Sequence, residues 1–272
     1  MSDAEKDGVA KWLRKSGFPL EMRVAAEWEK AGFDVSQSVY YVDPDTATVR
    51  ETDIVATKEN LTDDAWLRCF CVVECKSGRE PWVLFPRRGA PPNARSRVQN
   101  LAVSPLTAPY LSRISSRLDV AGLPIFASPT RPAYGMVQAS SDARDHAYAA
   151  MMSVSKAASV LLEQLHQSSD AEGSLELVWP LIVTEAPLFE AELSAAGEIS
   201  VQPIERGTLM WRHPTAGRGI RAIDVIHSDA AARFIEDVKS AVDLILWNTK
   251  TEASSAMEKR RELAAKLQRP TA

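Results

Sequence analysis

Two apolar segments of strand character, each carrying an acidic residue, constrain the fold of this chain more than any other feature. The first contains Asp53 within Thr-Asp-Ile-Val-Ala, and the second, Val-Val-Glu-Cys-Lys-Ser, places Glu74 21 positions later. Because side chains alternate along a strand, Glu74 and Lys76 are expected on one face and Cys75 on the other. A carboxylate and an ammonium group therefore share a patch of surface.

A polar stretch at residues 58–64 lies between the two segments and suits a turn. An antiparallel pairing centred near residue 63 or 64 would place Asp53 opposite Glu74. Carboxylate oxygens suit Mg²⁺, which usually takes one or two protein carboxylates and completes its shell with water and substrate phosphate oxygens. Such an ion can generate hydroxide and stabilise a phosphodiester transition state. Lys76 would add positive charge where negative charge develops.

At these residues the chain resembles the PD-(D/E)xK nuclease superfamily, and most nearly its restriction-type and junction-resolvase-like members. The resemblance covers roughly residues 17–85, and the helix expected at 19–31, with the Gly-Phe pair that follows it, looks like the family's first helix and its exit. Thr52 stands where the family name has proline. No Gln-x-x-x-Tyr pattern follows Lys76, which argues against the RecB-like branch.

The resemblance implies an α/β fold with a restriction-endonuclease-like core, a mixed central sheet flanked by helices in the order α-β-β-β-α-β. It also implies that Asp53, Glu74 and the backbone carbonyl of Cys75 bind Mg²⁺, for which Mn²⁺ can substitute. Lys76 would orient or activate the attacking water. Glu21, on the first helix, would be an auxiliary acid that assists metal or water binding.

Each of these patterns also has a simpler explanation. A Glu-x-Lys sequence at a strand end is often a solvated cross-strand charge pair. An acid in the first turn of a helix, such as Glu21, is favourable because it opposes the positive end of the helix dipole. The apolar stripe Leu20, Val24 and Trp28 has helical spacing and is predicted to pack in the core.

Three functional interpretations follow from these patterns. The first is a metal-dependent endonuclease that hydrolyses DNA, in defence against foreign DNA or in repair, with RNA left open as a substrate. The second is a non-catalytic nucleic-acid-binding or complex-assembly subunit that kept the same scaffold. The third treats Asp53 and Glu74 as unrelated surface charges, which requires the two carboxylates to lie far apart.

The local charge distribution favours a nucleic-acid partner although the net charge of the 272 residues is −4. Residues 78–117 carry seven arginines and one acid, a net charge of +6, directly after the Glu-x-Lys segment. Arginines neutralise and position phosphates, but the same residues also suit a solvated, proline-rich loop. The arginines expected to contact nucleic acid are Arg79, Arg87, Arg88, Arg95 and Arg97.

The organisation of the chain is expected to be a nuclease core at 1–186, with an irregular Arg/Pro-rich insertion at about 86–135, and a C-terminal α/β extension at 187–272. The extension either continues the core as part of the same domain or forms a small appended subdomain. The N-terminus lacks an apolar leader segment and no apolar run is long enough to span a membrane, which predicts a cytoplasmic protein without a membrane partner. Cutting both strands commonly needs two active sites, which makes a homodimer possible.

Hydrophobic periodicity predicts the remaining elements. A long helix is expected at 142–166 and another at 230–247. Cys69, Cys71 and Cys75 lie at even offsets on one strand face and are expected to be small core residues. Strands are expected at 34–42, 47–56, 66–77, 82–85, 175–185, 189–193, 199–204, 208–211 and 220–226.

Overall fold

The fold is seen in a computed structural model that describes residues 3–13, 16–61, 66–87, 98, 101–127, 131–139, 145–167, 174–210 and 222–267, with side chains described as far as residue 255. The helices are α1 (Asp3–Leu13), α2 (Phe18–Lys30), α4 (Ala108–Ile114), α5 (Leu118–Ala121), α6 (Pro124–Ala127), α7 (His146–Gln167) and α8 (Ala231–Leu267), with the 3-10 turn η2 (Ser228–Ala230) leading into α8.

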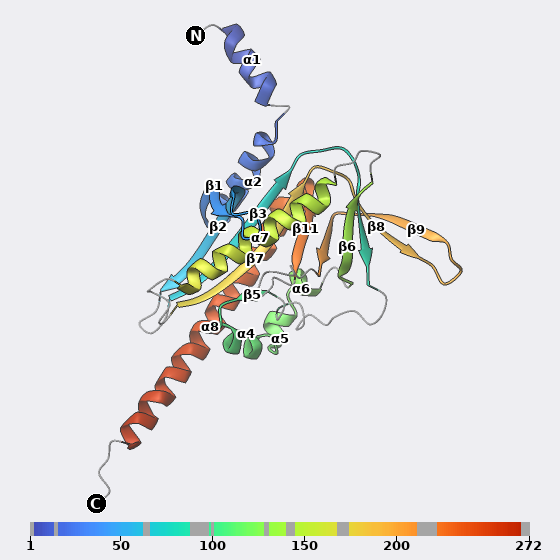
Figure 1. Ribbon diagram of the computed structural model, residues 1–272. Coiled ribbons are helices and arrows are strands. Elements are labelled where there is room, and N and C mark those ends of the chain that lie inside the picture. Colours follow the sequence, from blue (N-terminus) through green and yellow to red (C-terminus); the bar gives the residue numbers. More distant parts are fainter. Residues whose placement is uncertain are drawn as a thin grey trace, which may run out of the picture.

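One mixed sheet runs through the described residues (Figure 1). Its strands are β1 (Asp34–Val42), β2 (Val49–Leu61), β3 (Trp66–Lys76), β4 (Trp82–Pro86), β5 (Ala102–Val103), β6 (Ala133–Gln138), β7 (Ser174–Thr184), β8 (Leu188–Leu193), β9 (Ile199–Ile204), β10 (Arg206–Leu209) and β11 (Ile223–His227). The order across the sheet is β1-β2-β3-β7-β11-β10-β6-β4-β8-β9, and β5 pairs with the first half of β7.

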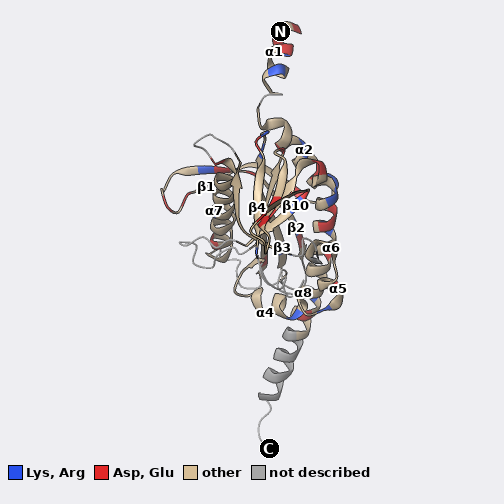
Figure 2. Ribbon diagram, turned by 90° about the vertical axis from the view of Figure 1, so that its right-hand side faces the viewer, with Lys and Arg blue, Asp and Glu red and all other residues tan. Residues whose placement is uncertain are grey.

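Helices cover both faces of this sheet (Figure 2). On one face, α7 packs through Ala150 and Val154 against Val72 of β3 and Ile182 of β7. Burying a valine or isoleucine side chain in this way stabilises the fold by roughly 1.5–3 kcal/mol. The two-sided cover explains why β3 and β7 are apolar along almost their whole length rather than alternating.

The opposite face is covered by α2 and α8, with the short helices α4, α5 and α6 beside them (Figure 2). The predicted stripe of α2 is confirmed as core, because Leu20, Val24 and Trp28 are all buried. The predicted role of the cysteines is also confirmed. All three are free thiols buried in this second core: Cys69, Cys71 and Cys75.

The central strands follow the predicted hairpins and crossover. β1 pairs antiparallel with β2, and β2 pairs antiparallel with β3. β3 then pairs in parallel with β7 over the whole of both strands, with α7 among the elements of the crossover between them. The expected mixed sheet flanked by helices is therefore present.

The segment at about 86–135 differs from expectation where the structure describes it. It was expected to be mostly irregular because of its prolines, but residues 101–127 contain three short helices and β5. Pro109 and Pro124 do not break helices here. They lie in the first turns of α4 and α6, where proline's missing N–H leaves no internal bond unmade.

The C-terminal strands join the same sheet instead of forming a set of their own. β8 and β9 make an antiparallel hairpin at one edge. β10 does not pair with β9 but lies inside the sheet between β6 and β11. The strands that were expected to start at 208 and 220 correspond to β10, which starts at Arg206, and β11, which starts at Ile223. Residues 211, 220 and 221 of the expected strands lie outside the described residues.

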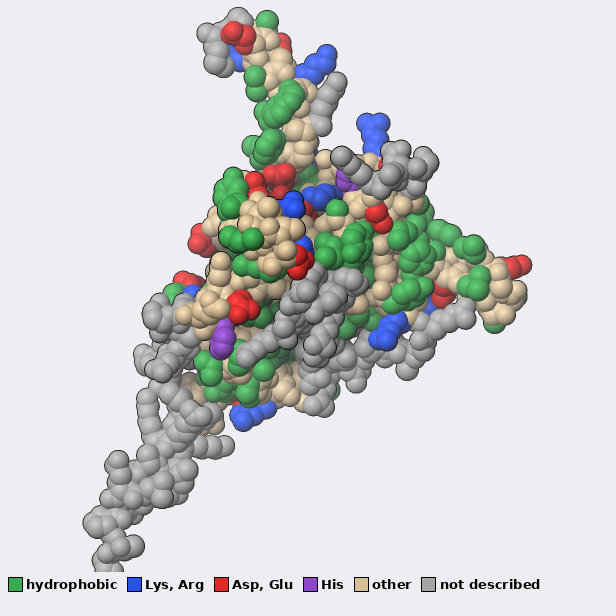
Figure 3. Space-filling view, in the orientation of Figure 1, with side chains coloured by type: hydrophobic (Ala, Val, Ile, Leu, Met, Phe, Trp, Pro, Cys, Tyr) green, Lys and Arg blue, Asp and Glu red, His purple; other side chains and the backbone are tan. Residues whose placement is uncertain are grey.

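The N-terminal helix α1 projects from the body of the molecule and buries none of its residues (Figure 3). Its Val9 and Trp12 are more than half exposed, and the Trp12 ring contacts the Phe18 ring at 6.1 Å between centroids. Among the described residues, no helix combines the length and the apolar character needed to cross a membrane.

Candidate active site

The hairpin of β2 and β3 places Asp53 and Glu74 on neighbouring strands. Ile54 pairs with Val73, and Asp53 and Glu74 are the next residues on the two strands. This register agrees with the expected centre of the hairpin near residue 63 or 64, which itself lies outside the described residues. The large separation required by the interpretation as unrelated charges is therefore excluded.

Asp53 is half-buried and fixed by the backbone of the neighbouring strand. The N–H of Cys75 donates to Asp53 Oδ2 at 2.6 Å. Burial raises the pKa of Asp53, and this effect outweighs the opposing influence of the Cys75 N–H and of the Lys76 charge. The folded protein thus keeps at this position a carboxylate that lacks full compensation for its lost hydration.

The strand β1 is distorted directly across from Asp53. Pairing between β1 and β2 holds at Gln37 with Ile54 and at Val39 with Thr52, and Ser38 between them has a φ of 54°. A non-glycine residue in the left-handed region costs roughly 1–2 kcal/mol. Strained residues of this kind often occur at functional sites, and this one lies next to Asp53.

Glu74 is almost completely buried, with 4% of its surface exposed, and its two oxygens have different partners. Oε1 forms an ion pair with Lys76, and Oε2 accepts a hydrogen bond of 2.9 Å from Ser153 Oγ on α7. Burial and the charge of Asp53 raise the pKa of Glu74 despite these two donors. The predicted grouping of Glu74 and Lys76 on one face is confirmed.

Lys76 is the last residue of β3 and is held by residues at the end of the neighbouring parallel strand β7. Its carbonyl accepts hydrogen bonds from Thr184 Oγ1 at 3.1 Å and from the Glu185 N–H at 3.0 Å. Burial acts to lower the pKa of Lys76, but the charges of Glu74 and Asp53 outweigh it and raise that pKa. Lys76 therefore remains an ammonium group that donates hydrogen bonds.

Glu21 reaches the same region from the first turn of α2. A β-carbon at Gly17 would lie 3.2 Å from Glu21 Oε1 and 3.8 Å from Ser77 Oγ, so the Glu21 carboxylate lies beside the end of β3. Burial and the charge of Asp53 raise the pKa of Glu21, while Lys76 opposes the shift. The four polar residues expected at the site thus influence one another in the folded chain.

The carboxylate oxygens at this site are ligands that suit a hard divalent cation. The half-buried Asp53 and the buried Glu74 are carboxylates of adjacent strands, and each has a raised pKa. Within the described residues, no three histidine, cysteine, aspartate or glutamate side chains already form a metal-binding group. Mg²⁺ fits a pair of carboxylates without a third, because it keeps several waters and binds substrate phosphates.

The arginines expected to contact nucleic acid are only partly within the described residues. Arg79, three residues after Lys76, and Arg87, after β4, are both exposed. Arg87 follows β4, and β4 is separated from the site strand β3 by four strands of the sheet: β7, β11, β10 and β6. Three others lie outside the described residues: Arg88, Arg95 and Arg97.

Other parts of the basic segment have structural roles. Arg113 pairs with Glu252 of α8 at 3.3 Å, and Arg117 pairs with Asp119 at 3.1 Å. Trp82, which could have stacked on an unpaired base, is a buried core residue instead. Phe85 is half-buried and its ring stacks on Tyr134.

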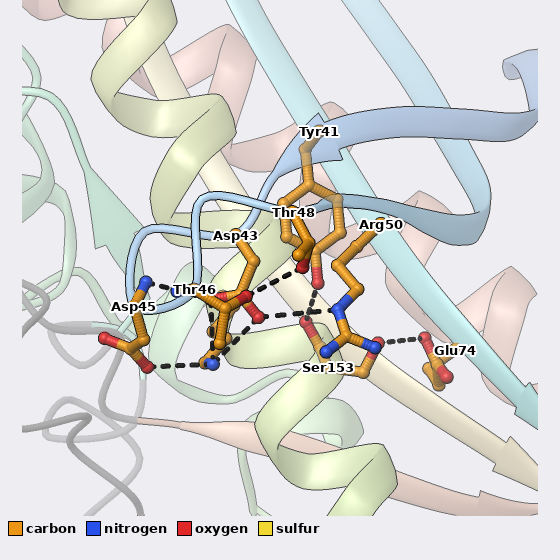
Figure 4. Close-up of polar contacts among 9 residues, drawn as sticks. Tyr41, Asp43, Asp45, Thr46, Thr48, Arg50, Glu74 and Ser153 are labelled. Carbon is orange, nitrogen blue, oxygen red and sulfur yellow. Dashed lines mark hydrogen bonds and ion pairs between the residues drawn. The ribbon is translucent and has the colours of Figure 1, made fainter.

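Sequence patterns did not indicate the residues that surround Glu74 and Asp43. Figure 4 shows Ser153 between Glu74 and Tyr41, whose hydroxyl donates to the Ser153 carbonyl at 3.4 Å. Asp43, in the turn after β1, accepts two hydrogen bonds of 3.0 Å from Lys156 of α7. These contacts join residues 79 to 113 positions apart and leave no local signal.

Comparisons of the chain with protein-family models, with curated proteins and with solved structures found no match. The function of the chain is therefore inferred from the arrangement of the side chains described above.

Proposed function

We propose that this chain is a Mg²⁺-dependent endonuclease of the restriction-endonuclease-like fold that hydrolyses DNA phosphodiester bonds, in defence against foreign DNA or in DNA repair. One observation carries the proposal: Asp53 on β2 lies next to the strand segment of β3 that bears the ion pair of Glu74 and Lys76. The order α2, β1, β2, β3, α7, β7, with β4 to β6 inserted before α7, supports the fold within residues 1–186.

Asp53 and Glu74 would hold Mg²⁺ together with the backbone carbonyl of Cys75. A bound ion would make a nearby water a better nucleophile and would stabilise the negative charge of the phosphodiester transition state. Burial raises the pKa of the half-buried Asp53 and of the buried Glu74, so a nearby divalent cation would compensate their negative charges.

Lys76 would act as a donor at this site. Its pKa is raised, so it stays protonated and orients the attacking water or neutralises the phosphate oxygens, instead of removing a proton itself. Glu21 would hold a second-sphere water or a ligand of the ion from the side of α2. This division of roles follows from the charge that each group carries in the folded chain.

The substrate would be positioned through its phosphates. Arg79 is exposed close in sequence to the site, and Arg87 is exposed farther along the sheet. Phosphate contacts of this kind make binding fall steeply with salt. A homodimer would bring a second site to the other DNA strand. RNA carries the same charged backbone, so both nucleic acids belong in the test.

The test compares wild type with Asp53→Ala in cleavage and in binding. We expect Asp53→Ala to lose metal-dependent cleavage of DNA by about 10²-fold or more, because a group that stabilises the transition state is removed. Salt-sensitive binding to the same DNA should persist. Asp34→Ala, an exposed aspartate at the start of β1, is the matched control and should cleave like wild type.

Two outcomes would replace the proposal. Full cleavage by purified Asp53→Ala would show that another site does the chemistry. Salt-sensitive binding without cleavage by wild type, in Mg²⁺ and in Mn²⁺, would favour the non-catalytic binding subunit. That alternative has one observation in its favour, since both oxygens of Glu74 already have protein partners.

A further inference from the structure

Three serines of α7 use their hydroxyl groups in three different ways. Ser159 Oγ donates to the Ser155 carbonyl one turn earlier, at 2.8 Å. Ser155 Oγ is buried and has no hydrogen-bond partner among the residues that the structure describes. Ser153 Oγ instead donates across to Glu74 on β3. Helical serines commonly bond back to their own helix, as Ser159 does, so the direction of Ser153 is distinctive.

The hydrogen bond from Ser153 gives the two oxygens of Glu74 different partners. Oε1 faces Lys76 and Oε2 faces Ser153. A carboxylate offers about four lone-pair positions, so these two donors leave about two for other ligands. Without Ser153, the carboxylate could turn both oxygens toward Lys76, which would occupy the ammonium group and the carboxylate with each other.

The position of Ser153 is itself fixed from a second direction. Tyr41 of β1 donates to the Ser153 carbonyl (Figure 4). Three residues later, Lys156 forms ion pairs with Asp43 at 3.0 Å and with Asp45 at 2.8 Å. The turn that joins β1 to β2 therefore holds this part of α7 over the end of β3.

We infer that Ser153 is a positioning residue, which sets the orientation of the Glu74 carboxylate so that it can bind a divalent cation while Lys76 stays available to water and phosphate. This inference deepens the proposed function and rests on it. Groups that hydrogen-bond to a metal ligand typically change metal affinity by 10–100-fold when they are removed.

The experiment measures binding of Mn²⁺ to the full chain by titration calorimetry, at one fixed pH and without nucleic acid. Ser153→Ala should weaken Mn²⁺ binding about ten-fold. Ser153→Thr keeps a hydroxyl at the same position and should restore affinity to near the wild-type value. Ser155→Ala removes from the same helix a hydroxyl that has no partner among the described residues, and this variant should bind Mn²⁺ as wild type does. Thermal melts establish that each variant is folded.

The results separate the two proposals. Wild-type affinity in Ser153→Ala, or equal weakening in Ser153→Ala and Ser153→Thr, would overturn the positioning role while leaving the proposed nuclease intact. Absence of Mn²⁺ binding by wild type would overturn both. A loss in Ser155→Ala as large as that in Ser153→Ala would also overturn the positioning role, because it would show a general effect of altering α7.

Discussion

Asp53 and Glu74 are placed where their charges work against the stability of the metal-free fold. Burial raises the pKa of both carboxyl groups above the ordinary value. The folded state therefore binds protons at these two groups more tightly than the unfolded state does. Their favourable contribution is complete below about pH 4, the range of unfolded carboxyl groups, and is lost as pH rises through the raised folded values. At neutral pH the pair destabilises the metal-free protein.

Replacing one of these charges should stabilise the protein while removing its activity. We expect Asp53→Asn to raise the unfolding free energy of the metal-free protein at neutral pH by about 1 kcal/mol, a size common for substitutions at strained functional sites. Chemical denaturation in EDTA measures this. Asp34→Asn on the exposed start of β1 is the control and should change little.

Metal should reverse the difference between the two proteins. The proposed Mg²⁺ site exists only in the folded state, so the ion should stabilise wild type and not Asp53→Asn. A less stable Asp53→Asn in EDTA, at a pH where Asp34→Asn matches wild type, would contradict the view that Asp53 carries an uncompensated charge.

The sequence predicted the polar residues of the candidate site better than their surroundings. Asp53, Glu74 and Lys76 lie on two strands of one hairpin, so alternation and a short turn suffice to bring them together. Ser153 reaches Glu74 across 79 positions, and Thr184 reaches Lys76 across 108. No periodicity in a single sequence encodes contacts of that span.

At the scale of elements, the turn between β1 and β2 connects the sheet to α7. Asp43 Oδ1 accepts hydrogen bonds from the N–H of Asp45 at 2.9 Å and from that of Thr46 at 3.3 Å. The same carboxylate also accepts a hydrogen bond from the Lys156 ammonium. Although burial acts to raise it, the pKa of Asp43 is lowered, since the donors around it outweigh burial, and the Lys156 ammonium is the strongest of them. Besides the ion pair of Asp45 with Lys156, the Asp43 carboxylate therefore both closes the turn and links it to α7.

Removing that carboxylate should loosen the turn and the helix together. We expect Asp43→Ala to lower the melting temperature at neutral pH and to speed amide hydrogen exchange at residues 43–48 and in the middle of α7. Asp45→Ala, which leaves the Asp43 bonds in place, should have a smaller effect in both measurements. Equal effects of the two variants would show that Asp43 has no special role in this connection.

Most strands, including the short β4, β8 and β9, lie close to their expected bounds, whereas α1, the short helices α4 to α6 and β5 were not expected. The helix expected at 19–31 and the strands at 34–42 and 66–77 correspond to α2, β1 and β3. In contrast, the prolines of α4 and α6 suggested irregular structure, because a proline in a first helical turn and one in a loop look alike in sequence. The two-residue β5 is too short to give a pattern at all.

At the scale of the whole molecule, the site lies in a sheet whose completion depends on distant parts of the chain. β3 pairs with β7, and β7 pairs with β11, which is followed by α8. The sequence predicted these strands but not that β10 and β11 enter the middle of the sheet, because strand order is decided by long-range pairing and not by local preference. The residues expected as a C-terminal extension thus pack with the strands that carry the site.

The central claim is that Asp53, Glu74 and Lys76 act together in metal-dependent hydrolysis of a phosphodiester. The most direct test incubates wild type and Lys76→Ala with supercoiled plasmid, linear duplex, single-stranded DNA and RNA, in Mg²⁺, in Mn²⁺ and in EDTA. We predict cleavage by wild type only when metal is present, and none by folded Lys76→Ala. Cleavage by Lys76→Ala at the wild-type rate, or cleavage by wild type in EDTA, would contradict the account.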